Sequence, residues 1–290
     1  MNEFDYTAPA TVEEAVAQLG TGARVLAGGT DLIVQMREGR RQVGHVVDLK
    51  RIAELTEVAS TPDGGVAIGA ALNVTALSAH PAMAAYPALV ESGRMIGSYQ
   101  IQNRASIGGN VCNAAPSADA VPALICLGAR AVVAGPGGRR DEPVEALFAG
   151  PGRTTLGPRD VLVSLRLPPA AKRSAAAYLR FTPRREMDIA VAGVGAWLRL
   201  DERGAVAEAR LTLAAVGPTP IRAAQAERLL IGEKPSAKLV AEAAALAARD
   251  ARPISDTRGS AEYRRELVKT LAARAVAACC ARLGNPLETA

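Results

Sequence analysis

Two glycine-rich loops, about eighty residues apart, carry the residues best suited to chemistry in this 290-residue chain. The first reads Ala27-Gly28-Gly29-Thr30-Asp31, and the second reads Ser106-Ile107-Gly108-Gly109-Asn110. Because glycine lacks a Cβ and reaches positive φ, consecutive backbone N–H groups in such loops can point at one anion. Two such loops could approach a diphosphate twice. The sequence therefore predicts a nucleotide-cofactor site, with FAD as the leading cofactor.

The usual side-chain signatures of nucleotide binding and catalysis are missing. Gly28-Gly29 is not followed by the rest of a Rossmann fingerprint, Asp48 matches its ribose-binding acid only loosely, and no P-loop is present. The only histidines are His45 and His80, and no nucleophile elbow or helical histidine pair occurs. An enzyme with so little acid–base chemistry would have to take it from a cofactor.

Asp119 lies ten residues after Gly109, just beyond Pro116. A carboxylate there could accept hydrogen bonds from ribityl or ribose hydroxyls. From spacing alone, a solvated loop aspartate or an N-cap for a helix starting at Ala120 is equally consistent. The charged stretch from Arg184 to Asp188 is typical of a solvated turn.

The four cysteines are typical of reduced thiols in a protein without its own metal site. They show no C-x-x-C spacing and no neighbouring histidine cluster, which argues against zinc or an iron–sulfur cluster held by this chain alone. They are Cys112, Cys126, Cys279 and Cys280.

Composition places the chain among soluble globular proteins of two or three domains, with 49 % hydrophobic and 22 % charged residues. The net charge of +5 comes from arginines with few interleaved aromatics, which argues against a nucleic-acid surface. No apolar run approaches the ~20 residues of a membrane span. The start lacks the features of a signal peptide. We expect a cytoplasmic protein that could reach a membrane only through a partner.

The order of elements predicts an α+β protein. Thr11 and Glu14 form a capping-box pattern before a helix, and strands at 24–27 and 45–49 flank the first glycine loop and a short helix, so a small parallel sheet is expected. From residue 65 onward, strands at 66–70, 131–134 and 161–165 with glycine–proline turns predict a mostly antiparallel second lobe. Strands at 176–181, 191–200 and 210–216 then precede helices capped by Ser236 and Ser260, the latter helix with Tyr263, Leu267 and Leu271 inward.

Five ordered blocks of residues resemble the FAD-binding medium subunit of molybdenum hydroxylases, the group of carbon monoxide and xanthine dehydrogenases. The resemblance covers nearly the whole chain. The blocks are Val25–Leu32 with Met36-Arg37, Gln102–Asn110 with Pro116 and Asp119, Arg184–Ala190, Val216–Pro220, and Ser255–Arg264.

This resemblance implies a two-lobed FAD-binding domain of the vanillyl-alcohol-oxidase type and a C-terminal α+β domain with a small antiparallel sheet. It implies a division at 1–173, with lobes of about 1–57 and 58–173, and 174–290. The diphosphate would lie on both glycine loops, Asp119 would hold ribityl or ribose hydroxyls, and other residues would line the cofactor. The implied cofactor-binding residues are Val25, Leu26, Ala27, Gly28, Gly29, Thr30, Asp31, Leu32, Ile96, Gly97, Ser106, Ile107, Gly108, Gly109, Asn110, Asp119, Leu162 and Arg180, the last where some relatives carry a lysine.

The implied activity is electron transfer within a complex. A large molybdopterin-binding subunit would hydroxylate the substrate, a small subunit with two [2Fe–2S] clusters would relay electrons, and FAD on this chain would pass them to an acceptor, in a dimer of heterotrimers. The alternatives are a self-contained FAD-dependent oxidoreductase with its own substrate pocket, and a non-enzymatic protein that has lost its flavin.

Overall fold

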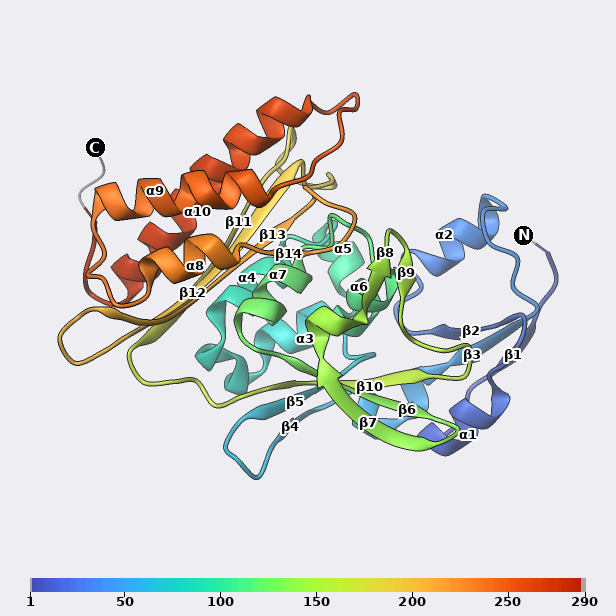
Figure 1. The fold of residues 1–290 in the computed structure, drawn as a ribbon. Coiled ribbons are helices and arrows are strands. Elements are labelled where there is room, and N and C mark those ends of the chain that lie inside the picture. The colour runs from blue at the N-terminus through green and yellow to red at the C-terminus, as the bar shows by residue number, and fades with distance from the viewer. Residues whose placement is uncertain (1, 288–290) are drawn as a thin grey trace.

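The computed structural model describes residues 2–287, in which three main sheets follow one another along the chain (Figure 1). The first is a parallel sheet of order β1-β3-β2, as the alternation of strand and helix predicts. At its start, Thr11 and Glu14 form the expected capping box of α1. The elements of this part are β1 (Asp5–Thr7), α1 (Val12–Gln18), β2 (Ala23–Leu26), α2 (Leu32–Arg37), β3 (His45–Asp48) and 3₁₀ turns at Leu49–Arg51 and Ala53–Leu55.

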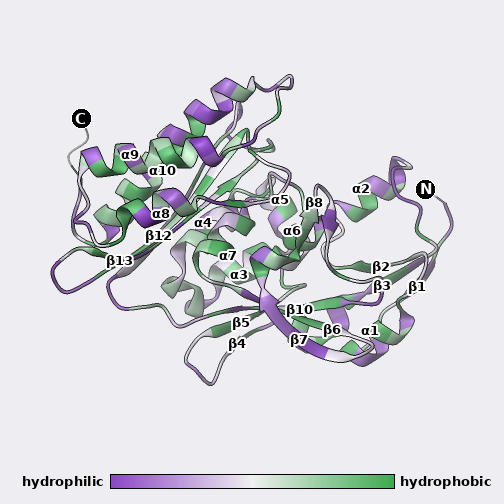
Figure 2. Ribbon diagram, viewed as in Figure 1, coloured by the Kyte–Doolittle hydropathy of each residue, from purple (hydrophilic) through white to green (hydrophobic). Residues whose placement is uncertain are grey.

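The second sheet is antiparallel, in the order β4-β5-β10-β6-β7, with α3 to α7 between its second and third strands in the sequence. The edge strand β7 is hydrophilic along its length (Figure 2), which discourages edge-to-edge association. The elements are β4 (Val58–Ser60), β5 (Val66–Gly69), α3 (Val74–Ala79), a 3₁₀ turn at Pro81–Ala85, α4 (Pro87–Arg94), α5 (Tyr99–Gln102), α6 (Ile107–Asn113), α7 (Ala120–Cys126), β6 (Arg130–Gly135), β7 (Gly138–Pro143), a 3₁₀ turn at Val144–Leu147, β8 (Phe148–Gly150), β9 (Arg153–Thr154) and β10 (Val161–Leu167).

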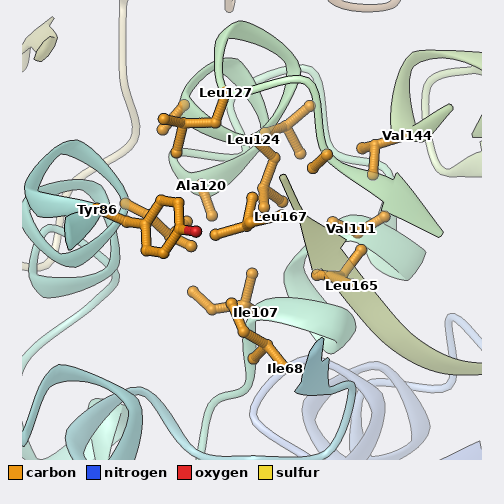
Figure 3. Packing of buried hydrophobic residues seen from close by; sticks show 14 of the residues in the cluster. Ile68, Tyr86, Ile107, Val111, Ala120, Leu124, Leu127, Val144, Leu165 and Leu167 are labelled. Atoms are coloured by element: carbon orange, nitrogen blue, oxygen red, sulfur yellow. The ribbon is translucent and has the colours of Figure 1, made fainter. Parts of the chain in front are cut away.

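The core of this part lies between the second sheet and its helices (Figure 3). Leu165 of β10 and Leu124 of α7 are both fully buried, and Ile107 at the start of α6 packs in the same cluster. Full burial of one such side chain stabilises a fold by roughly 1.5–3 kcal/mol. Ile107 is therefore anchored in the core, which fixes where the second glycine loop begins.

The third sheet has the order β11-β12-β13-β14 and is antiparallel. Helices α8 to α10 cover one face, while α4 and α7 of the preceding part pack on the other (Figure 1). A Cβ on Gly195 of β12 would lie 2.8 Å from the Pro122 carbonyl oxygen, so only glycine permits this contact with α7. The elements are β11 (Ser174–Phe181), β12 (Ala192–Leu200), β13 (Val206–Ala214), β14 (Ile221–Arg222), α8 (Ala224–Leu230), α9 (Ala237–Asp250) and α10 (Ala261–Arg282).

The prediction that Tyr263 faces inward is wrong. Tyr263 is 44 % exposed and meets Phe181 only edge-on, with the ring centroids 6.1 Å apart. Its neighbour Arg264 takes the inward position instead and is 4 % exposed. The reason is that Arg264 donates to the carbonyl oxygens of Val191 and Ala215, which lie under the first turn of α10.

The α+β fold class predicted from the sequence is confirmed, with the parallel sheet, the antiparallel second sheet and the C-terminal sheet with its helices in the expected order. The division at residues 57, 173 and 174 stays a proposal. The first part packs on the second through a shared apolar cluster that joins α1 and β3 to β6 and β10.

Candidate functional site

The first glycine loop connects β2 to α2 and is shaped by two different uses of glycine. Gly29 has φ of +77°, a conformation that a side chain would strain. Gly28 instead permits close approach, because a Cβ there would lie 2.1 Å from the carbonyl oxygen of Arg104. The first loop therefore lies directly against the segment that leads into the second.

The second glycine loop forms the first turn of α6. Ser106 is the N-cap, and its Oγ accepts a hydrogen bond of 3.0 Å from the amide of Gly109. A Cβ on Gly108 would lie 2.4 Å from the carbonyl oxygen of Ala70, so this glycine lets α6 sit against the end of β5. Neither Gly108 nor Gly109 has positive φ. Glycine is needed at Gly108 because it has no side chain, and not because of an unusual backbone conformation.

Both loops leave backbone donors without acceptors. Within residues 2–287, the amides of Gly28, Gly29 and Thr30 make no hydrogen bond, and neither does that of Gly108. The Ile107 amide is engaged by the bridge between Asn73 and Ser106. Unpaired backbone N–H groups gathered in this way are the ordinary means of holding phosphate oxygens.

These loops face one cavity of about 570 Å³. That volume lies in the usual range for small-molecule and cofactor sites. The first sheet supplies one side of the cavity, and α6 with the β8–β9 hairpin and the loop after it supplies the other. Gln35 of α2 donates a hydrogen bond of 3.3 Å to Asn113 of α6 across it.

Most of the residues predicted at the cofactor line this cavity together. They are Val25, Ala27, Gly28, Gly29, Thr30, Asp31, Leu32, Ile96, Ser106, Gly108, Gly109, Asn110 and Leu162. The remaining predicted residues do not line it: Leu26, Gly97, Ile107, Asp119 and Arg180. Contact of each with a cofactor stays a prediction.

Asp119 is buried behind the second loop and is neither a solvated loop residue nor a side-chain cap. It occupies the N-cap position of α7 without a capping hydrogen bond, and Asn110 caps Ala120 in its place, at 3.3 Å. The Asp119 carboxylate accepts from the Tyr178 hydroxyl at 2.7 Å and pairs with the Arg180 guanidinium at 2.5 Å. Burial raises the pKa of Asp119 to about 6, against the opposing effect of Arg180.

Three arginines on the cavity wall were not anticipated from the sequence. Arg24 extends from β2, Arg41 follows α2, and Arg153 begins β9. Among residues 2–287, none of the three forms an ion pair with a carboxylate. Their positive charge suits a diphosphate, but no local motif marks them, because the folded chain alone brings them to this cavity.

The thiol of Cys112 also lines the cavity, but it is poorly suited to act as a thiolate. Burial raises its pKa to about 12, so the sulfur is protonated at neutral pH. Across the described part of the chain, no group of His, Cys, Asp and Glu side chains is arranged to hold a metal ion.

Two profiles of known protein families match this chain. Residues 2–170 match the family profile described as the FAD binding domain in molybdopterin dehydrogenase. Residues 177–279 match the CO dehydrogenase flavoprotein C-terminal domain. The chain belongs to the FAD-binding medium subunits of the molybdenum hydroxylases.

Individual relatives of this family match over almost the full chain. The carbon monoxide dehydrogenase medium chain of Hydrogenophaga pseudoflava is 33 % identical over 96 % of this chain and 98 % of its own. The xanthine dehydrogenase FAD-binding subunit of Escherichia coli O157:H7 is 31 % identical over 98 % of both. A solved structure of the Hydrogenophaga pseudoflava carbon monoxide dehydrogenase matches with a TM-score of 0.92 and 34 % identity, over 97 % of this chain and 98 % of that one.

The residues of this medium subunit fit FAD. Unpaired amides on two loops and unpaired arginines face one cavity, which is what a diphosphate flanked by two ring systems requires. The chain is therefore an FAD-binding oxidoreductase subunit, and a flavin-free, non-enzymatic protein is set aside. No helix in the described residues has both the length and the apolar character to cross a membrane.

Proposed function

We propose that this chain transfers electrons through FAD, from [2Fe–2S] clusters on a small partner subunit to an external acceptor. In the same proposal, a large molybdopterin-binding subunit hydroxylates the substrate, and the assembly is a dimer of heterotrimers. Membership of the family and the near-complete match to medium chains of multi-subunit enzymes support this view. We further propose a cytoplasmic location, with any contact to a membrane made by the partners.

The observation that carries the proposal is the meeting of the two glycine loops at one cavity. The Gly28 backbone lies against Arg104, and the residues that carry the unpaired amides of both loops line the same cavity. We assign the diphosphate to these amides, with Arg24, Arg41 and Arg153 offsetting its charge. We also propose that Leu26, Gly97, Ile107, Asp119 and Arg180, which do not line the cavity, contribute to cofactor binding.

Bound FAD would supply the redox chemistry, because its isoalloxazine accepts and releases electrons. The chain's own part is to bind, orient and shield it. Across the described residues, this site offers no ionised thiol and no metal cluster, and neither histidine lines the cavity. A site with so few side chains suited to acid–base or nucleophilic catalysis favours electron transfer over a reaction on a substrate that this chain would bind.

The test is to purify the native protein and identify its flavin and partners. Denaturation should release FAD and no FMN, because FMN lacks the diphosphate that the two loops suit. Sizing should give a particle far larger than 29.9 kDa, with molybdenum and iron in the co-purifying chains. A monomer that reduces a small substrate unaided would instead establish a self-contained flavoenzyme. Release of FMN, or of no flavin, would contradict the site.

A further inference from the structure

Lys50 lies close behind the first glycine loop but does not line the cavity. It follows β3, and its ammonium Nζ lies 2.7 and 2.8 Å from the two carboxylate oxygens of Asp48. The same Nζ donates a hydrogen bond of 3.1 Å to the carbonyl oxygen of Ala27, which does line the cavity. Lys50 thus bridges the end of β3 to the residue that opens the glycine loop.

We propose that Lys50 is a positioning residue that orients the first glycine loop for the diphosphate of the cofactor. The Ala27–Gly28 peptide bond is trans, as are all peptide bonds described, and in a trans peptide the C=O and N–H point in opposite directions. Holding the Ala27 oxygen toward Lys50 therefore directs the Gly28 amide away from it. That amide is one of the unpaired donors of the loop.

The anchor of this bridge is itself held in place. Asp48 is 7 % exposed, and its carboxylate accepts 2.7 Å and 3.0 Å hydrogen bonds from the Tyr6 hydroxyl and the Lys50 amide. Burial raises the pKa of Asp48, but hydrogen bonds from Lys50 and Tyr6 outweigh it and hold the pKa below its usual value. Asp48 is thus ionised at neutral pH and offsets the Lys50 charge. The effect of Lys50 on the loop is accordingly geometric, through one carbonyl, and not a free positive charge offered to the ligand.

The inference rests on the proposed FAD site, so the experiment separates the two. FAD is titrated into flavin-free wild-type protein and into Lys50→Met, and the visible spectrum of the bound flavin is recorded. Lys50→Met should bind FAD about tenfold more weakly, the loss expected when one charge-assisted hydrogen bond no longer fixes the loop. The spectrum of the bound flavin should not change, because the isoalloxazine end does not depend on Lys50. The unfolding temperature of the flavin-free protein should fall, because Lys50→Met leaves the buried Asp48 carboxylate without its counter-charge.

Two further variants complete the test. Lys238→Met, on the exposed surface of α9, is the matched control and should bind as wild type. Tyr6→Phe removes one hydrogen bond from Asp48 and should weaken FAD about two- to threefold, which keeps the test available if Lys50→Met does not fold. Wild-type affinity in both Lys50→Met and Tyr6→Phe would overturn the positioning role. An equal loss in affinity with a shifted flavin spectrum would show general loosening of the site instead. Failure of the wild-type protein to bind FAD would overturn the proposed function itself.

Discussion

Replacing Gly109 by valine tests whether the second glycine loop holds the cofactor, because this substitution leaves the fold nearly untouched. A Cβ at Gly109 meets only the Ser106 Oγ, at 3.0 Å, so the cap must shift by a few tenths of an ångström. The backbone there is not at positive φ, so no strain is added. Exchanging glycine for a residue with a side chain even favours the helix slightly, by a few tenths of a kcal/mol.

Gly109→Val should weaken the binding of FAD. The valine methyl groups would occupy the space beside the unpaired amide of Gly108, which lines the cavity. Hydrogen bonds from such amides to a charged group are worth about 1.5–3 kcal/mol each. Losing the bond from Gly108 gives about 1.5–3 kcal/mol, or roughly a 10- to 10²-fold weaker binding of FAD. Gly109→Ala should lose less, because its single methyl group reaches less far.

The assay is a titration of FAD into flavin-free protein, alongside circular dichroism and thermal unfolding. The expected result is a folded Gly109→Val variant, with an unfolding temperature close to that of the wild type, that retains little flavin after purification. A folded variant with wild-type affinity for FAD would show that this loop is only the start of a helix. The diphosphate would then have to be assigned elsewhere in the cavity.

Three other predictions follow from contacts at the same site. Gly28→Ala should lose both FAD and stability, because its Cβ would lie 2.1 Å from the Arg104 carbonyl oxygen, whereas Gly20→Ala, with open space around it, should behave as wild type in flavin content and thermal unfolding. Arg153→Gln should weaken FAD about three- to tenfold and flatten the salt dependence of binding, since an unpaired cation is removed from the cavity; an unchanged salt dependence would contradict this. Burial raises the pKa of Asp119 from 3.8 to about 6 in the folded protein, so its protonation favours the folded state at low pH, and this contribution, at most about 3 kcal/mol, is lost as pH rises from about 4 to 6. In urea titrations over that range, the unfolding free energy of the wild type should therefore fall relative to that of Asp119→Asn, and a rise relative to the variant would refute the assigned shift.

The local features of this protein can be read from neighbouring residues in the chain. The capping box at Thr11, the strands on either side of the first loop and the two Gly-Gly steps are set by neighbouring residues, so pattern and spacing were enough to predict them. The ordered blocks that match the medium-subunit family were also legible, and the family profiles confirm that assignment.

How these local features meet in space depends on long-range packing. Nothing local to Gly28 shows that Arg104 will lie against it, and nothing local to Asp119 shows that Tyr178 and Arg180 will enclose it. The inward turn of Arg264 in place of Tyr263 likewise depends on distant carbonyl groups. These contacts join residues dozens of positions apart, and their free energy comes from burial and from pairing groups that the fold brings together. For the same physical reason, the arginines on the cavity wall and the Lys50 bridge became visible only once the chain was folded.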